Sequence, residues 1–287
     1  MKFVTYHSKV GPRVAAIRDG AYVDLQAADP TLSWSLKELL AGGEESLHRA
    51  AKAAAVGELI DPSSVRVLAP IPDPQKVICI GLNYADHARE SGMEPPPEPV
   101  VFNKFPTAVA AHEDTIVLPD ESKEVDYEAE LVVVIGRRGR HIAEADALSH
   151  VAGYAVGNDV SARDWQAHKP GKQWLLGKTF DGFAPFGPTL VTPDEVGDPN
   201  NLRVQFRLNG KTLQDSSTSQ FIFNVQQVIA YVSQVCTLLP GDVIFTGTPP
   251  GVGFARTPPV FLRPGDVCEV EIEKVGLLRN AVVAATR

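Results

Sequence analysis

Two glutamates separated by a single residue begin the segment of this 287-residue sequence with the clearest capacity for chemistry. Successive side chains of a strand point to opposite faces, so Glu128 and Glu130 share one face of a strand expected to run to Ile135. Both faces of that strand become apolar, which predicts burial on both sides. Two buried like charges repel and are costly to desolvate, and a divalent cation would relieve both costs. An exposed strand end within the acidic stretch 120–130 is the alternative.

A third carboxylate, Asp159, follows a second apolar segment at residues 152–156. Oxygen ligands completed by water suit Mg²⁺ or Mn²⁺. The cysteines and histidines show no spacing typical of zinc. The sequence therefore indicates a site for Mg²⁺ or Mn²⁺ at Glu128, Glu130 and Asp159.

An acid–base pair is predicted after the apolar strand at residues 77–80. Asn83 is expected to cap a helix over residues 83–91, which places His87 and Glu90 three residues apart on one helical face. A carboxylate beside an imidazole orients it and raises its basicity. An exposed surface pair is the bland alternative. The proline-rich stretch 94–99, which follows Ser91, is either the arm of a lid or a plain surface loop.

Two cations and one glycine-rich segment are candidates for holding an anionic substrate. Arg163 lies four residues after Asp159, and Lys178 lies in the segment 176–181, although either is equally compatible with a surface position. Residues 246–253 end a strand in a glycine-rich loop whose N–H groups could bind a carboxylate, with a simple tight turn as the alternative. The loop matches neither a phosphate-binding loop nor a dinucleotide fingerprint.

The elements that must position these residues are mainly strands. The proline-rich stretch 69–74 predicts a boundary between a small N-terminal α/β domain (1–70), with a helical region at 34–58, and a larger domain (71–287). The larger part contains many strands, few helices (about 83–91, 144–150 and 224–236) and a hairpin at Asn209-Gly210. This pattern predicts an α+β, β-rich fold with a mixed β-roll or sandwich as its catalytic domain.

Composition and charge exclude several classes of protein. With 27 basic and 35 acidic residues, the net charge of −8 argues against nucleic-acid or anionic-membrane partners. No apolar run approaches the length of about 18 residues needed to span a membrane. Three cysteines, an odd number, fit a reducing compartment. We therefore expect a cytoplasmic protein.

The assembled motifs resemble the fumarylacetoacetate hydrolase superfamily over about residues 70–285. Five segments match in order: 81–84 with His87 and Glu90, 128–130, 158–164, 177–181 and 247–253. Residues 173–181 and 258–262 are similar to the fumarylacetoacetate hydrolase domain-containing protein 2 subgroup. The resemblance implies a β-roll homodimer with one Mg²⁺ or Mn²⁺ per subunit.

The resemblance also implies roles for individual residues. Glu128, Glu130 and Asp159 match metal ligands, and His87 and Glu90 match a lid dyad that activates water. Lys178 matches a lysine near the carbonyl or enolate oxygen of the substrate. Arg163, Gln166 and Thr248 match substrate-side positions.

The reaction expected first is hydrolysis of a C–C bond in a 2,4-dioxo acid of the acylpyruvate type, through a metal-stabilised enolate. Tautomerisation or decarboxylation of oxaloacetate, or isomerisation of a 2-hydroxy-dienoate, is the alternative on the same site. A non-catalytic binding protein would be indicated by loss of His87 or Glu90, and both are present.

Overall fold

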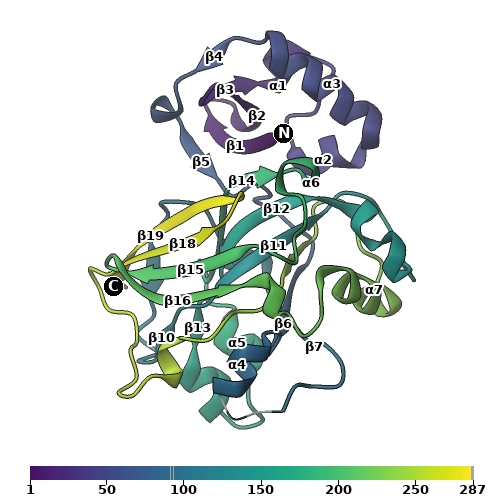
Figure 1. The fold of residues 1–287 in the computed structure, drawn as a ribbon. Helices are drawn as coiled ribbons and strands as arrows, with labels where there is room; N and C mark the ends of the chain where they lie inside the picture. Colours follow the sequence, from purple (N-terminus) through teal and green to yellow (C-terminus); the bar gives the residue numbers. More distant parts are fainter. Residues whose placement is uncertain (91, 93, 286–287) are drawn as a thin grey trace.

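The N-terminal elements form one end of the molecule in the computed structural model, which describes residues 1–90, 92 and 94–285 (Figure 1). They are β1 (Lys2–Ser8), β2 (Gly11–Arg18), β3 (Ala21–Asp24), α1 (Leu25–Ala28), α2 (Leu36–Ala41), α3 (Gly43–Val56), β4 (Leu59–Ile60) and β5 (Arg66–Leu68). Within the described residues, no helix is long and apolar enough to cross a membrane.

A twelve-stranded mixed sheet runs through the whole molecule in the order β4-β3-β2-β1-β14-β12-β11-β17-β6-β7, with β5 and β8 beside it. Its later strands are β6 (Val77–Gly81), β7 (Val100–Lys104), β8 (Val109–Ala110), β11 (Ala129–Ile135), β12 (Val151–Asn158), β14 (Ala184–Val191) and β17 (Val243–Phe245). Because β1 pairs with β14, the sheet crosses the expected boundary at residue 70. The division into residues 1–70 and 71–287 therefore remains a proposal.

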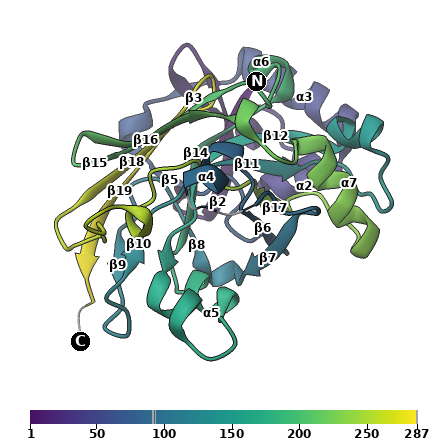
Figure 2. The same ribbon diagram turned by 60° about the horizontal axis from the view of Figure 1, so that its bottom comes forward.

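A second sheet of five strands lies along one side of the molecule, with α7 and β7 on the other (Figure 2). Its strands, in sheet order, are β16 (Lys211–Ser217), β15 (Arg203–Leu208), β18 (Val267–Ile272), β19 (Gly276–Ala284) and β9 (Ile116–Leu118). The remaining elements are β10 (Val125–Asp126), β13 (Ser161–Ala162), α4 (Ala85–Glu90), α5 (Trp174–Lys178), α6 (Pro193–Val196) and α7 (Val225–Val235). The β-rich α+β fold predicted from the sequence is confirmed.

Strand β11 is buried on both faces, as its sequence predicts. Leu131, Val133 and Ile135 pack into the cluster shared with the five-stranded sheet. Val132 and Val134 pack into the opposite cluster, which reaches the N-terminal elements. The two-residue period thus assigns alternate side chains to two different cores and fixes the face on which the preceding glutamates lie.

Two helix predictions from the sequence require correction or refinement. The helical region 34–58 forms two helices. The helical conformation is interrupted at Gly42 and Gly43, and Gly43 has a φ of 64°. The helix expected at 144–150 is a 3₁₀ helix. The hairpin at Asn209-Gly210 is confirmed, since both residues have positive φ and join β15 to β16. Residues 94–99 form no helix and, before Val100, no strand, while Ser91 lies outside the described residues.

The expected role of Asn83 as a helix cap is wrong. Helix α4 begins at Ala85, and the buried Asn83 side chain instead connects two distant segments. Its Nδ2 donates to the Thr246 oxygen at 2.8 Å and to the Phe223 oxygen at 3.0 Å, and its Oδ1 accepts from the Phe223 N–H at 2.8 Å. The spacing of residues along the local sequence cannot reveal these partners, because they lie 140 or more residues away.

Replacing Asn83 should test this cross-link. Asn83→Ala leaves one buried backbone group of Thr246 and two partly buried groups of Phe223 unpaired; the buried one costs about 1–3 kcal/mol, and the partly buried ones cost less because water can reach them. We expect the free energy of unfolding to fall by about 2–4 kcal/mol in urea titrations. Asn201→Ala, at an exposed position, is the control and should change stability by less than about 0.5 kcal/mol. Equal stability of the two variants would contradict the role assigned to Asn83.

Candidate active site

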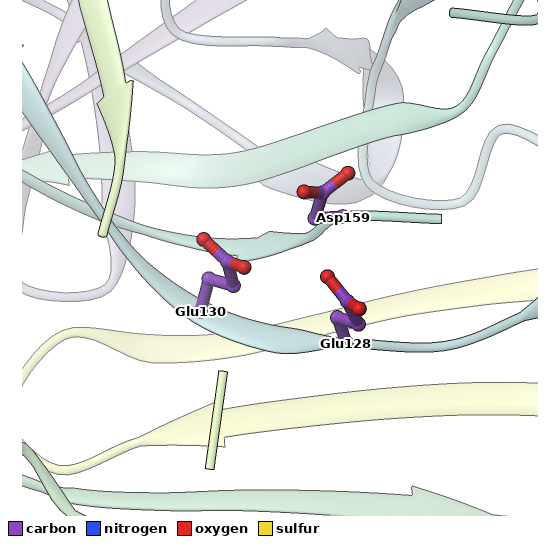
Figure 3. Close-up of side chains that lie close together, drawn as sticks. All are labelled: Glu128, Glu130 and Asp159. Carbon is purple, nitrogen blue, oxygen red and sulfur yellow. The ribbon is translucent and has the colours of Figure 1, made fainter. Parts of the chain in front are cut away.

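The three acidic residues singled out from the sequence come together where β11 and β12 meet. Ala129 pairs with Asn158 across the two strands, so the residues flanking this pair, Glu128 and Asp159, are neighbours. One carboxylate oxygen from each of Glu128, Glu130 and Asp159 lies within 4.8 Å of the others, and all three residues are buried. Figure 3 shows the three carboxylates facing a common space.

Glu128 is held between two cations. Its Oε1 lies 2.6 Å from Arg163 Nη2, and its Oε2 accepts from Lys178 Nζ at 2.5 Å. Burial alone would raise the pKa of Glu128, but Lys178 and Arg163 outweigh it and hold the pKa at about 2. Burial likewise opposes the charge of Lys178, yet Asp159 and Glu128 raise the pKa of the lysine. Neither Arg163 nor Lys178 is a surface residue.

Asp159 is also flanked by two lysines. Lys178 Nζ donates to its Oδ2 at 3.0 Å, and Lys104 Nζ lies 2.5 Å from its Oδ1. The approach of Lys104 is not aligned for a hydrogen bond, and within the described residues Asp159 Oδ1 has no hydrogen-bond partner. Lys104 instead donates to the carbonyl oxygens of Val160 and Phe183. A lone pair of a buried carboxylate is thus left available.

Glu130 carries the uncompensated charge of the cluster. Its Oε2 accepts from the N–H of Gly247 at 2.8 Å, and within the described residues no cation pairs with it. Burial, followed by repulsion from Asp159 and Glu128, raises the pKa of Glu130 well above its usual value. An all-oxygen donor set with an unpaired lone pair and an excess of negative charge fits a hard divalent cation. Each carboxylate has about four lone-pair positions, so lysine contacts and a metal ion can share it.

The predicted acid–base pair is formed on α4. His87 Nδ1 lies 3.2 Å from Glu90 Oε2, and both Glu90 oxygens accept from the N–H of Gly251 at 3.1 Å. The side chains remain 15% and 32% exposed, respectively. Because Nδ1 contacts Glu90, Nε2 is the ring nitrogen left to face a substrate.

The sequence suggests that the N–H groups of the glycine-rich loop 246–253 could bind a substrate carboxylate. In the structure, three of these groups instead donate to carboxylates of the protein itself. Gly247 donates to Glu130, Gly251 to Glu90, and Gly253 to Asp126 at 2.8 Å. At Gly253 a Cβ would lie 1.8 Å from the Val260 oxygen and 2.6 Å from Asp126 Oδ1, so glycine is required for this close approach. The loop connects the protein's own carboxylates.

A pocket of about 200 Å³ opens onto this cluster. Its walls include seven of the nine sequence-predicted site residues: His87, Glu128, Glu130, Arg163, Gln166, Lys178 and Thr248. The other two, Glu90 and Asp159, contact the wall residues His87 and Lys178, respectively. Gln166 lies in a π-helical turn, Asp164–His168, and its Oε1 accepts from Arg163 Nη1 at 2.9 Å, which leaves its NH₂ group available to a ligand. Phe102, Trp174 and Phe254 supply apolar surface.

Three buried residues support this site through contacts that the sequence does not predict. Lys104 follows an apolar strand and gives no local sign that it reaches Asp159. Asp126 contacts Arg163 Nε and Nη2 at 2.9 Å each and thereby aims the guanidinium at Glu128. Gln214 connects β11 to Thr248. Of the three, only Asp126 could have been identified from the sequence, because it lies in the acidic run before Glu128. The partners of Lys104 and Gln214 are distant in sequence.

Comparison with known proteins finds solved structures with the same fold. The solved structure titled a putative HpcE protein from Mycobacterium smegmatis matches with a TM-score of 0.88 and 40% identity, over 100% of both chains. A second, maleylpyruvate hydrolase from Sphingobium sp. SYK-6 in complex with manganese(II) ion and pyruvate, matches with a TM-score of 0.83 and 29% identity, again over 100% of both chains. The model of the family described as fumarylacetoacetate (FAA) hydrolase, C-terminal, matches residues 76–283.

The chain belongs to the fumarylacetoacetate hydrolase family. Among curated relatives, the Bos taurus protein named oxaloacetate tautomerase FAHD2A, mitochondrial, is 52% identical over 265 residues, covering 92% of this chain and 84% of that protein. The resemblance to the domain-containing protein 2 subgroup is thereby confirmed.

Metal binding by the carboxylate cluster is tested at Glu130, because this residue carries the uncompensated charge. Mn²⁺ at 100 times its dissociation constant should stabilise the wild-type protein by about 2.7 kcal/mol, measured as a rise in Tm. We expect Glu130→Gln to remove most of this rise while leaving the metal-free protein at least as stable, since a buried repulsive carboxylate is lost. Glu121→Gln, at an exposed position, should respond like wild type. An undiminished response of Glu130→Gln to Mn²⁺ would count against the site.

Proposed function

We propose that the chain is a divalent-cation-dependent enzyme for a small 2-oxo acid and that it interconverts the keto and enol forms of oxaloacetate. The 52% identity over 92% of the chain to a protein named oxaloacetate tautomerase supports this reaction over the C–C hydrolysis that the sequence analysis put first. The pocket of about 200 Å³ is smaller than the 300–1,000 Å³ typical of drug-sized ligands, which suits a short diacid.

We assign the cation, Mg²⁺ or Mn²⁺, to Glu128, Glu130 and Asp159. When bound, it would supply Lewis-acid stabilisation of negative charge on the substrate's 2-oxo oxygen. The manganese in the related maleylpyruvate hydrolase structure supports a metal of this class. The observation on this chain that carries the assignment is the convergence of three buried carboxylates, with one oxygen of each within 4.8 Å of the others.

The remaining groups have roles that follow from their positions. His87 Nε2 removes a proton from C3 of the keto acid, while Glu90 holds the Nδ1 side of the ring and stabilises the imidazolium that forms. Lys178, a charged group in the pocket wall, stabilises the negative charge that develops on the 2-oxo oxygen. Arg163, the Gln166 NH₂ group and the Thr248 hydroxyl are assigned to the substrate carboxylates. Return of the proton to oxygen gives the enol, and ketonisation is the reverse.

Hydrolysis of an acylpyruvate-type acid is the second candidate. It is favoured by the assembled His87–Glu90 pair, which can deprotonate a water molecule, and by the likeness to a maleylpyruvate hydrolase. Decarboxylation of oxaloacetate requires the same stabilisation of negative charge on the 2-oxo oxygen, but it breaks a C–C bond instead of a C–H bond. The 2-hydroxy-dienoate isomerase alternative also requires proton transfer between carbon atoms.

Product analysis separates these reactions. Enol-form oxaloacetate is mixed with the Mn²⁺-loaded or Mg²⁺-loaded protein, and the ultraviolet absorbance of the enol is followed. Faster decay than in buffer with no pyruvate formed indicates tautomerisation, whereas pyruvate and CO₂ indicate decarboxylation. Acetylpyruvate and fumarylpyruvate are assayed in parallel for hydrolysis. Decay at the buffer rate would contradict the tautomerase proposal.

The acid–base role of His87 gives a specific kinetic expectation. His87→Ala should lower the rate of enol decay by about 10²–10⁴-fold, because a positioned acid–base group contributes that much. Mn²⁺ affinity should stay at the wild-type value, since His87 does not belong to the carboxylate cluster. His168→Ala is the matched control, because that side chain is 60% exposed, and it should retain full activity. A wild-type rate in His87→Ala would exclude His87 as the base.

We also keep the homodimer as a proposal. Its support on this chain is β7, the terminal strand of the twelve-stranded sheet, where Val100 and Val101 are 36% and 44% exposed, followed directly by Phe105, which is 47% exposed. An apolar edge strand is prone to pair with another chain. Size-exclusion chromatography with light scattering measures the state directly. The cytoplasmic location likewise remains a prediction, and the name of the Bos taurus relative places that protein in mitochondria.

A further inference from the structure

Gln214 is a buried amide on β16 that lies behind the pocket rather than in its wall. Its side chain makes three hydrogen bonds to two different parts of the site. Oε1 accepts from the N–H of Ala129 at 3.0 Å, and Ala129 lies between the metal-ligand candidates Glu128 and Glu130 in the sequence. Nε2 donates to the Pro249 oxygen at 2.8 Å and to Thr248 Oγ1 at 2.8 Å.

The partners fix the orientation of this amide without ambiguity. The Ala129 N–H can only donate, so it must face the Gln214 oxygen, and the Pro249 carbonyl can only accept, so it must face the nitrogen. A flipped amide would break both hydrogen bonds. The second N–H of the NH₂ group therefore points at Thr248 Oγ1.

The hydrogen-bonding direction of Thr248 follows from this geometry. An amide nitrogen has no lone pair to offer, so the Thr248 hydroxyl accepts from Gln214 and cannot donate to it. Among the described residues, Gln214 is the only hydrogen-bond partner of that hydroxyl. Its own hydrogen is thus free, and Thr248 lies in the pocket wall.

We propose that Gln214 is a positioning residue that orients the Thr248 hydroxyl to donate a hydrogen bond to a carboxylate bound in the pocket. This inference rests on the proposed function, in which Thr248 contacts the substrate. A pocket that binds an anion gains only from donors, and a hydroxyl is free to be either donor or acceptor. Gln214 occupies one of the two lone pairs of the hydroxyl and so favours donation into the pocket before the substrate arrives, which is preorganisation of the kind that improves binding.

Kinetics of the Mn²⁺-loaded protein with oxaloacetate test the inference. Gln214→Met, which keeps the volume but not the N–H groups, should raise KM about 10–100-fold, the range expected for losing a hydrogen bond to a charged group. The kcat value should change by less than about threefold, because the interaction is the same in ground and transition states. Thr248→Val should have the same effect. Thr212→Val, exposed on the same strand, is the control and should match wild type.

The double variant distinguishes positioning through Thr248 from a merely structural role. If Gln214 acts through the hydroxyl, adding Gln214→Met to Thr248→Val raises KM by no more than about twofold further. Additive effects on KM, or a loss of kcat with KM unchanged, would overturn the inference. Gln214→Glu, which retains the acceptor for the Ala129 N–H, is compared in the same two backgrounds and keeps the test valid if Gln214→Met does not fold.

A neutron structure of the deuterated, Mn²⁺-loaded protein tests the geometry independently of activity. We expect the deuteron of Thr248 to point into the pocket and a deuteron of Gln214 to lie between Nε2 and Oγ1. A Thr248 deuteron directed at Gln214 would overturn the inference, whatever the protein catalyses. Absence of oxaloacetate turnover in the wild-type protein would instead overturn the proposed function and leave this geometry intact.

Discussion

Three buried carboxylates lie close together in this protein, where water reaches them only through a small pocket. The cost of burying like charges is several kcal/mol per ion even after relaxation, so each must be compensated by the surrounding chain. Arg163, Lys178 and Lys104 supply three positive charges around Glu128 and Asp159. Glu130 is left with one backbone N–H and a raised pKa. The divalent cation that we propose would complete this compensation and make the pocket more positive, which would favour an anionic substrate.

The glycine-rich loop couples this cluster to the acid–base pair. Its N–H groups donate to three carboxylates. Glu130 belongs to the candidate metal site, Glu90 to the acid–base pair, and Asp126 is the carboxylate that pairs with Arg163. The loop is therefore a common support for groups that each lie more than 100 residues before it in the sequence. Preorganised supports of this kind hold reacting groups in place without reorganisation at the moment of reaction.

The sequence predicts those features that depend on local periodicity or on residue type. Alternation along residues 128–135 placed Glu128 and Glu130 on one face, and helical spacing placed His87 beside Glu90. The hairpin at Asn209-Gly210 follows from the positive φ that those residues tolerate. The strand-rich fold follows from the scarcity of helical segments between strands.

Features that depend on contacts between distant segments could not be predicted in this way. Lys104 approaches Asp159 across 55 positions of sequence, and Gln214 reaches Ala129 across 85. Asn83 offered a plausible local role as a cap, yet tertiary hydrogen bonds to Phe223 and Thr246 determine its side chain. The leucine spacing and alanine content predicted one helical region over residues 34–58, but the interruption at Gly42 and Gly43 divides it into two helices. The order of the candidate reactions changed only with the names of relatives, because proton transfer and hydrolysis use the same groups.

The central claim is that Glu128, Glu130 and Asp159 together coordinate one hard divalent cation. Crystals of the protein soaked in Mn²⁺ and measured at a wavelength near the manganese absorption edge locate that ion by its anomalous signal. The account predicts one strong peak at direct-coordination distance from an oxygen of all three carboxylates. A peak elsewhere, or no peak at these residues with Mn²⁺ in excess, would contradict it.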